Sequence, residues 1–214
     1  MSQSNEIPGV ELKDNKFKLV GWKNMNDPTQ RLRSSISDSD SNTNFWQIEG
    51  SNGENILEFN YKGKSEGYYI TNQNNELIAR MGKNNQIDEI PDADKKLEPV
   101  HIYSVNDGKI IASNKGGVSG STSGALYEPN SEEKIMELET NYIRAMLSLI
   151  PFSPITFSWN ITNSDDDSIG SIKEKLRIKP WADPKKVIEF KNTGDITDIV
   201  TFCTLCEIVR ASLE

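Results

Sequence analysis

The sequence is poor in the residues on which many enzymes and metal sites depend. It has one histidine, His101, and two cysteines, Cys203 and Cys206, in 214 residues. Histidine-based acid–base or triad catalysis would therefore depend wholly on His101. A structural zinc site usually takes four ligands, and the Cys203-x-x-Cys206 pair lacks partners. A disulfide-stapled secreted domain would need more cysteines along the chain. We therefore expect buried, reduced thiols, no cofactor and no enzymatic machinery.

The chain also lacks an excess of positive charge. It has 24 Lys and Arg against 32 Asp and Glu, a formal net charge of −8, and a sequence pI near 4.9. General nucleic-acid binding needs a surplus of basic residues to contact phosphates, so we expect no nucleic-acid partner. Hydrophobic residues make up 35% of the chain and charged residues 26%, which is typical of a soluble protein with a modest core.

The N-terminal residues also show no pattern typical of a targeting signal. Residues 1–8 contain no basic segment followed by an apolar run, as a secretory signal would. We expect no transmembrane segment and a cytoplasmic protein whose contact with a membrane would be peripheral.

Alternating apolar segments separated by turn clusters dominate residues 45–176. They predict five successive hairpins, with strands at 45–48 and 56–61, 68–70 and 77–81, 101–105 and 110–112, 125–127 and 135–138, and 155–161 and 169–172. The first turn contains Asn52-Gly53, which readily takes the positive φ of a type I′ turn. A further pair of strands, 10–13 and 17–22, is expected to turn at Asp14-Asn15.

Two polar stretches interrupt this pattern. Residues 31–44 are dense in Ser, Asp and Asn and cannot bury enough apolar surface to offset the entropy of ordering, so they predict a mobile loop. Residues 82–97 indicate another long connection. Neither stretch requires a domain boundary, and we expect one domain over residues 1–214.

The pattern of residues 199–213 differs from that of the strand segments before them. They are apolar around most of a helical wheel, which predicts a buried helix. Such a helix would be about 22 Å long, short for a bilayer span, and it contains Glu207 and Arg210. A final β-strand is the alternative, because Ile, Val, Thr and Phe are good strand formers. Three residues are candidates for the N-terminal cap: Asp195, Thr197 and Asp198.

The predicted strands and the C-terminal helix together indicate an all-β fold. An open sheet of about ten to twelve strands would leave two exposed edges, and closure into a barrel removes them. A barrel of that size has an interior too wide for strand side chains alone, and an apolar helix would fill it. We expect a large closed antiparallel barrel of about twelve strands around a C-terminal hydrophobic helix.

Two segments resemble a known group of proteins. The strand–turn–strand unit at residues 69–79, and the acidic residue followed by an apolar helix at 198–209, are similar to units of the tubby C-terminal-like superfamily. That superfamily includes the LURP-one-related proteins and the phospholipid scramblases. The resemblance implies a binding function, either peripheral attachment to anionic phospholipid or phosphoinositide, or service as a protein-interaction scaffold. The chain departs from the scramblases in lacking a cysteine-rich segment, and from membrane-binding tubby domains in its acid excess.

A row of basic residues is the best candidate for binding such an anion. On a strand, these residues alternate with Glu174, Leu176 and Ile178 and so face one side: Lys173, Lys175, Arg177 and Lys179. Such a row is also ordinary for a solvent face that resists aggregation. Two other classes remain as alternatives: a hydrolase that uses two carboxylates in a cleft, and an oligomeric structural protein.

An acidic turn is a weak candidate for calcium. Counted from Asn163, oxygen-bearing residues fall at the first, third and fifth positions, with Asp165 and Asp167 as the third and fifth, and Glu174 falls at the twelfth, as in an EF-hand loop. The sixth position is Ser168 rather than glycine, and the flanks are typical of strands. A solvated hairpin tip is the alternative, and we expect no firm metal site.

Overall fold

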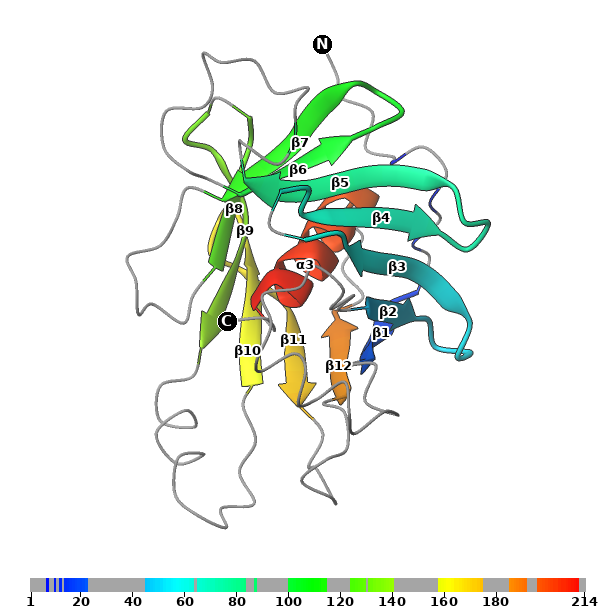
Figure 1. Ribbon diagram of the computed structural model, residues 1–214. Coiled ribbons are helices and arrows are strands. Elements are labelled where there is room, and N and C mark those ends of the chain that lie inside the picture. Colours follow the sequence, from blue (N-terminus) through cyan, green and yellow to red (C-terminus); the bar gives the residue numbers. More distant parts are fainter. Residues whose placement is uncertain are drawn as a thin grey trace, which may run out of the picture.

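The computed structural model describes residues 7, 10, 12, 14–22, 45–63, 65–83, 87, 100–114, 124–129, 131–140, 158–174, 185–191 and 196–211. This part of the chain forms twelve strands and a C-terminal helix (Figure 1). Their bounds are β1 Lys16–Trp22, β2 Phe45–Glu49, β3 Asn55–Tyr61, β4 Tyr68–Asn72, β5 Leu77–Lys83, β6 Val100–Ser104, β7 Lys109–Asn114, β8 Gly124–Tyr127, β9 Lys134–Thr140, β10 Ser158–Asn163, β11 Ser168–Glu174, β12 Lys185–Phe190 and α3 Asp198–Ala211.

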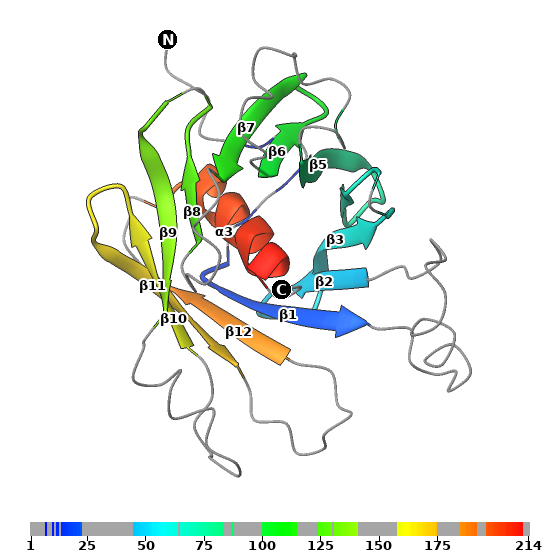
Figure 2. The same cartoon turned by 60° about the vertical axis from the view of Figure 1, so that its left-hand side comes forward.

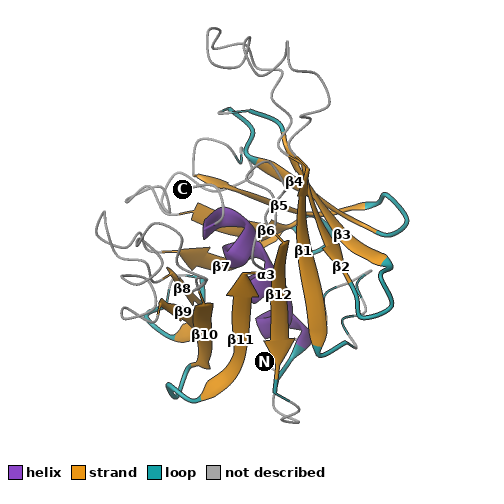
Figure 3. Cartoon of the chain, turned by 90° about the horizontal axis from the view of Figure 1, so that it is seen from below, coloured by secondary structure: helices purple, strands orange, loops and turns teal. Residues whose placement is uncertain are grey.

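The strands form one closed antiparallel barrel. Each strand pairs with its neighbours in sequence, and β1 pairs with β12 to complete the ring. The helix α3 lies inside that ring, as two views of the barrel show (Figures 2 and 3). The predicted fold class is therefore confirmed. Within the described residues, no helix combines the length and the apolar character needed to span a membrane.

The core lies between the inner wall of the barrel and α3. Inward side chains such as Phe17, Leu57 and Ile70 are fully buried, and so are Phe202 and Leu205 of the helix. All nine residues at positions 201–209 are buried, as expected for a helix that is apolar on nearly every side. The interpretation of this segment as a final strand is wrong, because the surrounding barrel supplies a partner for every face of a helix.

One of the three candidate residues, Thr197, caps the N-terminus of α3. The Thr197 Oγ1 accepts a hydrogen bond from the backbone N–H of Val200, 3.3 Å away. The backbone N–H of Thr201 donates to the Thr197 carbonyl oxygen at 3.0 Å, which is the first helical hydrogen bond. Thr197 thus satisfies donors that the helix itself cannot.

The five predicted hairpins are present, but the first turn differs from its predicted type. A type I′ turn needs positive φ at two successive residues, and only Gly53, with φ of 80°, has it here. The N–H of Gly53 donates to the Gly50 carbonyl oxygen at 3.1 Å, and the N–H of Gly50 donates to the Glu54 carbonyl oxygen at 2.9 Å. The loop is therefore a tight turn followed by one left-handed residue.

Two other hairpins, Asn72–Glu76 and Asn163–Asp167, repeat the same hydrogen bonds. Their left-handed residues are Asn75, with φ of 60°, and Asp166, with φ of 63°, two residue types that tolerate this conformation. In both, the leading asparagine accepts two backbone N–H groups at its Oδ1. Local turn chemistry therefore sets these registers.

The predicted pairing of residues 10–13 with 17–22 is wrong. Val10 and Leu12 are not in a strand, and both are buried against the core. The β1 strand pairs instead with β2 and with β12. The strand β12 was not predicted from the sequence, and no local pattern shows that it lies beside β1. The predicted mobile loop at 31–44 lies outside the described residues.

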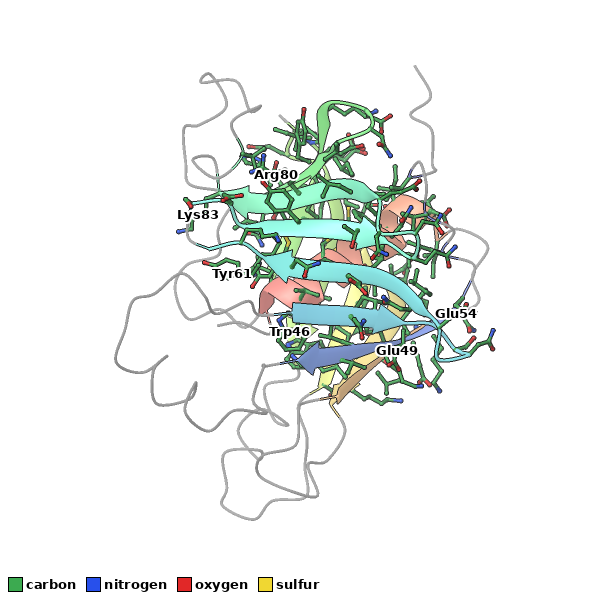
Figure 4. All side chains as sticks on the ribbon, turned by 45° about the vertical axis from the view of Figure 1, so that its right-hand side comes forward. Trp46, Glu49, Glu54, Tyr61, Arg80 and Lys83 are labelled. Atoms are coloured by element: carbon green, nitrogen blue, oxygen red, sulfur yellow. The ribbon has the colours of Figure 1, made fainter. Side chains whose placement is uncertain are left out.

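The barrel has two different ends. One, which we call the hairpin end, carries the short turns at 50–54, 73–76, 105–108, 128–133 and 164–167. Figure 4 shows Glu49 and Glu54 at this end of β2 and β3, with Trp46 and Tyr61 at the opposite end. The chain leaves β12 at the hairpin end and enters α3 a few residues later, so the helix runs from the hairpin end toward the opposite end.

Candidate functional site

A surface cleft lies on the outer wall of the barrel, near the hairpin end. Its volume is about 460 Å³, and residues of β1, β10, β11 and β12 and their flanks line it. Seven of its nine lining residues are polar or charged: Asn15, Lys16, Asn160, Ser168, Ser171, Glu189 and Lys191. The cleft therefore offers charged and hydrogen-bonding groups to a ligand.

Strand alternation positions the charged groups of this wall. Phe17 and Phe190 point inward and pack edge to face, with ring centroids 6.1 Å apart. Because successive side chains point to opposite faces of a strand, Lys16 and Glu189 point outward. These two residues are opposite each other in the β1–β12 register, so the aromatic contact inside holds the ion pair outside.

Glu189 is the centre of a small charge network. Lys16 Nζ lies 2.5 Å from Glu189 Oε1, and Lys173 Nζ lies 3.5 Å from Glu189 Oε2. The hydrogen bond from Lys16, supported by the charge of Lys173, holds the pKa of the Glu189 carboxyl below its usual value. Lys191 Nζ donates to the Ser168 carbonyl oxygen at 2.5 Å. Lys16 and Lys173 thus pair with one carboxylate, and Lys191 lines the same cleft, so these four residues carry an excess of positive charge on a chain whose net charge is −8.

The structure describes one member of the predicted basic row. Lys173 lies on the outer face of β11 with 61% of its side chain exposed, and it reaches Glu189 at the cleft. Lys175, Arg177 and Lys179 lie outside the described residues. Sequence reasoning missed Lys16 and Lys191. The pairing of β1 with β12 brings Lys16 to Glu189, and the pairing of β11 with β12 brings Lys191 to the same cleft.

The calcium candidates are not gathered in one place. Asp165 and Asp167 lie at the exposed turn, where the Asn163 Oδ1 already accepts their backbone N–H groups at 3.0 and 2.9 Å. Glu174 lies at the other end of β11, about 20 Å along an extended strand. Within the described residues, no group of three or more His, Cys, Asp or Glu is arranged to hold a metal ion.

The two cysteines and the histidine are all buried. Cys203 and Cys206 are unpaired and fully buried, as predicted. Burial raises the pKa of the Cys203 thiol to about 12 and that of Cys206 well above its ordinary value, and the nearby Glu207 acts in the same direction. Such thiols are poor nucleophiles. His101 is also buried, with its Nδ1 hydrogen-bonded to the Ser113 Oγ at 2.7 Å.

Comparisons with known proteins identify no relative: no family model matches the chain, and neither a curated protein nor a solved structure matches it significantly. The resemblance to the tubby C-terminal-like superfamily therefore stays a prediction from the sequence.

Proposed function

We propose that this protein is a non-enzymatic binding module that attaches to anionic phospholipid through the outer face of β11, β12 and β1. The observation that carries the proposal is the pairing of Lys16 and Lys173 with Glu189 at a cleft that Lys191 also lines. We refer to these four residues as the lysine cluster.

Because α3 fills the interior of the barrel, we expect a ligand to bind on its outer wall. Large barrels that bind a ligand along their axis keep that axis open. Here α3 takes that place, and its residues 201–209 are buried on every side. A ligand inside the barrel would have to displace the helix and expose its apolar side chains to water.

The lysine cluster has the chemistry of an anion-binding surface. Lys16 and Lys173 have 49% and 61% of their side chains exposed, so their ammonium groups can reach a phosphate without losing most of their hydration. Each cation near an anionic membrane contributes about 1 kcal/mol to binding. The Asn160 amide and the Ser171 hydroxyl at the cleft offer further hydrogen-bond donors to headgroup oxygens.

A hydrolase that uses two carboxylates has less support at this cleft. Glu189 is the one carboxylate among the described residues that line it, and its pKa is lowered rather than raised. A general acid needs a raised pKa to hold its proton near neutral pH. Glu189 instead acts as an ion-pair partner that keeps two lysine side chains at the cleft.

Sedimentation with liposomes tests the proposal. Vesicles of phosphatidylcholine, alone or with phosphatidylserine or a phosphoinositide, would be compared at low and physiological salt. We expect binding to the anionic vesicles alone, weakening as salt shortens the range of electrostatic attraction. Neutralising Lys16, Lys173 and Lys191 to glutamine should abolish this binding. Charge reversal at Lys175 and Arg177 in the same assay tests the predicted row.

A matched control separates a specific face from net charge. Lys62, Lys83 and Lys109 are exposed and lie elsewhere on the barrel, and replacing them by glutamine changes the net charge by the same amount. Binding should survive in that variant. Equal losses in the two triple variants would contradict the proposed face, and absence of binding by the unmodified protein would favour a protein-interaction scaffold.

A further inference from the structure

One member of the lysine cluster is itself an anion. Each carboxylate oxygen of Glu189 contacts one lysine: Oε1 lies 2.5 Å from Lys16 Nζ, and Oε2 lies 3.5 Å from Lys173 Nζ. The Glu189 side chain is 39% exposed, so a dissolved ligand can reach it. A carboxylate and a phosphate present similar anionic oxygens to an ammonium group. Glu189 therefore makes, with both lysines, the contact that a phosphate ligand would make.

Strand register places this carboxylate between the two lysines. Lys16 on β1 and Ser171 on β11 are both opposite Glu189 on β12, and Lys173 is the next outward residue of β11 after Ser171. The lysines thus approach Glu189 from the two strands that flank β12 (Figure 3). Glu189 also lines the cleft. A ligand that contacts both lysines therefore also comes close to this carboxylate.

A second lysine–carboxylate pair lies on the same wall. Lys18 on β1 and Lys173 on β11 are both opposite Val187 of β12. The Lys18 Nζ lies 3.8 Å from the Glu49 Oε2 of β2. This pair is longer than the contact between Lys16 and Glu189, and it involves one lysine rather than two. Glu49 should therefore compete with a ligand less than Glu189 does.

We propose that Glu189 is an internal competitor at the anion-binding face: it pairs with Lys16 and Lys173 in the unbound protein, and an anionic ligand must displace it from both. This inference rests on the proposed binding of anionic phospholipid by the same face. The attraction between the lysines and Glu189, which also lowers the pKa of its carboxyl, is lost when a phosphate takes its place. Binding is therefore weaker than the same lysines would give without the carboxylate.

Neutralising the competitor tests the inference through a gain of binding. Glu189→Gln keeps the size of the side chain but removes its charge. In sedimentation with vesicles of phosphatidylcholine and phosphatidylserine, we expect its affinity to rise about fivefold, because one charge near an anionic membrane changes binding by about this factor. A variant that fails to fold would not show such a gain. Unchanged or weaker binding would overturn the inference, because Glu189 would then position the lysines for the ligand rather than compete with it.

Further variants separate competition from net charge. Glu132→Gln makes the same change of charge at an exposed residue of the turn 128–133, and it should alter the affinity little. Glu49→Gln should give a gain smaller than that of Glu189→Gln. Adding Lys16→Gln and Lys173→Gln to Glu189→Gln should abolish the gain. Equal gains in Glu189→Gln and Glu132→Gln would assign the effect to net charge and overturn the inference.

Inorganic phosphate separates this inference from the proposed function. Backbone amide NMR signals of β1, β11 and β12 would be followed during a phosphate titration at constant ionic strength. We expect Glu189→Gln to bind phosphate about two- to fivefold more tightly than the unmodified protein, the range typical of an exposed charge pair. This gain without vesicle binding by either protein would support the competitor and contradict the membrane function. No gain with either probe would overturn the inference, whether or not the unmodified protein binds vesicles.

Discussion

Two joins of this barrel connect strands that lie at very different distances along the chain. The β1–β12 join connects strands 173 residues apart, yet the two are matched over five residues, Lys16–Val20 opposite Glu189–Lys185. The β7–β8 join connects consecutive strands, and among the described residues Ser113 lies opposite Tyr127. Loop closure adds only about 0.6 kcal/mol for each doubling of loop length, so distance along the chain is a weak determinant of either join.

Different kinds of side chain line the two joins. Inside the β1–β12 join, Phe17 and Phe190 form an aromatic contact, and outside it Lys16 and Glu189 form an ion pair. At the β7–β8 join, the Asn114 Nδ2 donates to the Glu207 Oε1 at 3.1 Å, and a Cβ added to Gly124 would collide with that oxygen. Apolar burial therefore lines the inside of one join, and a polar contact with the central helix lines the inside of the other.

The largest effect is expected inside the β1–β12 join. Phe17 is fully buried, so Phe17→Ala should lower the free energy of unfolding by about 3–5 kcal/mol, through lost burial and the remaining cavity. Urea unfolding followed by circular dichroism measures this change. Lys18→Ala, on the outer face of the same strand, is the control and should change stability little. Similar costs in both variants would mean that apolar burial does not hold this join.

A smaller effect is expected at the β7–β8 join. In Gly124→Ala, the added Cβ must displace the Glu207 carboxylate, which should cost about 1–3 kcal/mol of unfolding free energy. Made in a Glu207→Ala background, the same substitution should cost much less, because the group it displaces is gone. A double-mutant cycle from urea unfolding measures the coupling. Additive effects would show that the carboxylate does not determine the requirement for glycine.

The smallest effect concerns the ion pair on the outer face. The pKa of Glu189 is lowered in the folded protein, so its contribution to stability is present above the pKa of the unfolded chain and is lost as pH falls through the folded value. Lys16→Met removes the main cause of that shift and should reduce the acid-induced loss of stability by about 0.2–1 kcal/mol, since the pair is exposed.

Urea unfolding at about pH 7 and about pH 3 brackets the titration of this carboxyl. In a Glu189→Gln background, Lys16→Met should no longer alter the pH dependence. A change of the same size in that background would assign the effect to other carboxyls.

The local elements could be predicted from the sequence. Asn-rich and Gly-containing turns determine the hairpins at 50–54, 72–76 and 163–167, because backbone conformation there depends on a few neighbouring residues. The apolar wheel of residues 199–213 predicted a buried helix on the same grounds. The candidate site was predicted in part: Lys173 was identified, whereas Lys16 and Lys191 come from distant segments that no local pattern joins.

By itself, therefore, the sequence determined the hairpins, the helix and the need to close a large sheet around it. Tertiary structure alone decided which strand lies beside β1, which lysines pair with Glu189, and which strand residues contact Glu207. The reason is physical: turn and helix preferences depend on groups a few residues apart, whereas the β1–β12 register and the burial of the Glu207 charge depend on contacts between segments that only the closed barrel brings together.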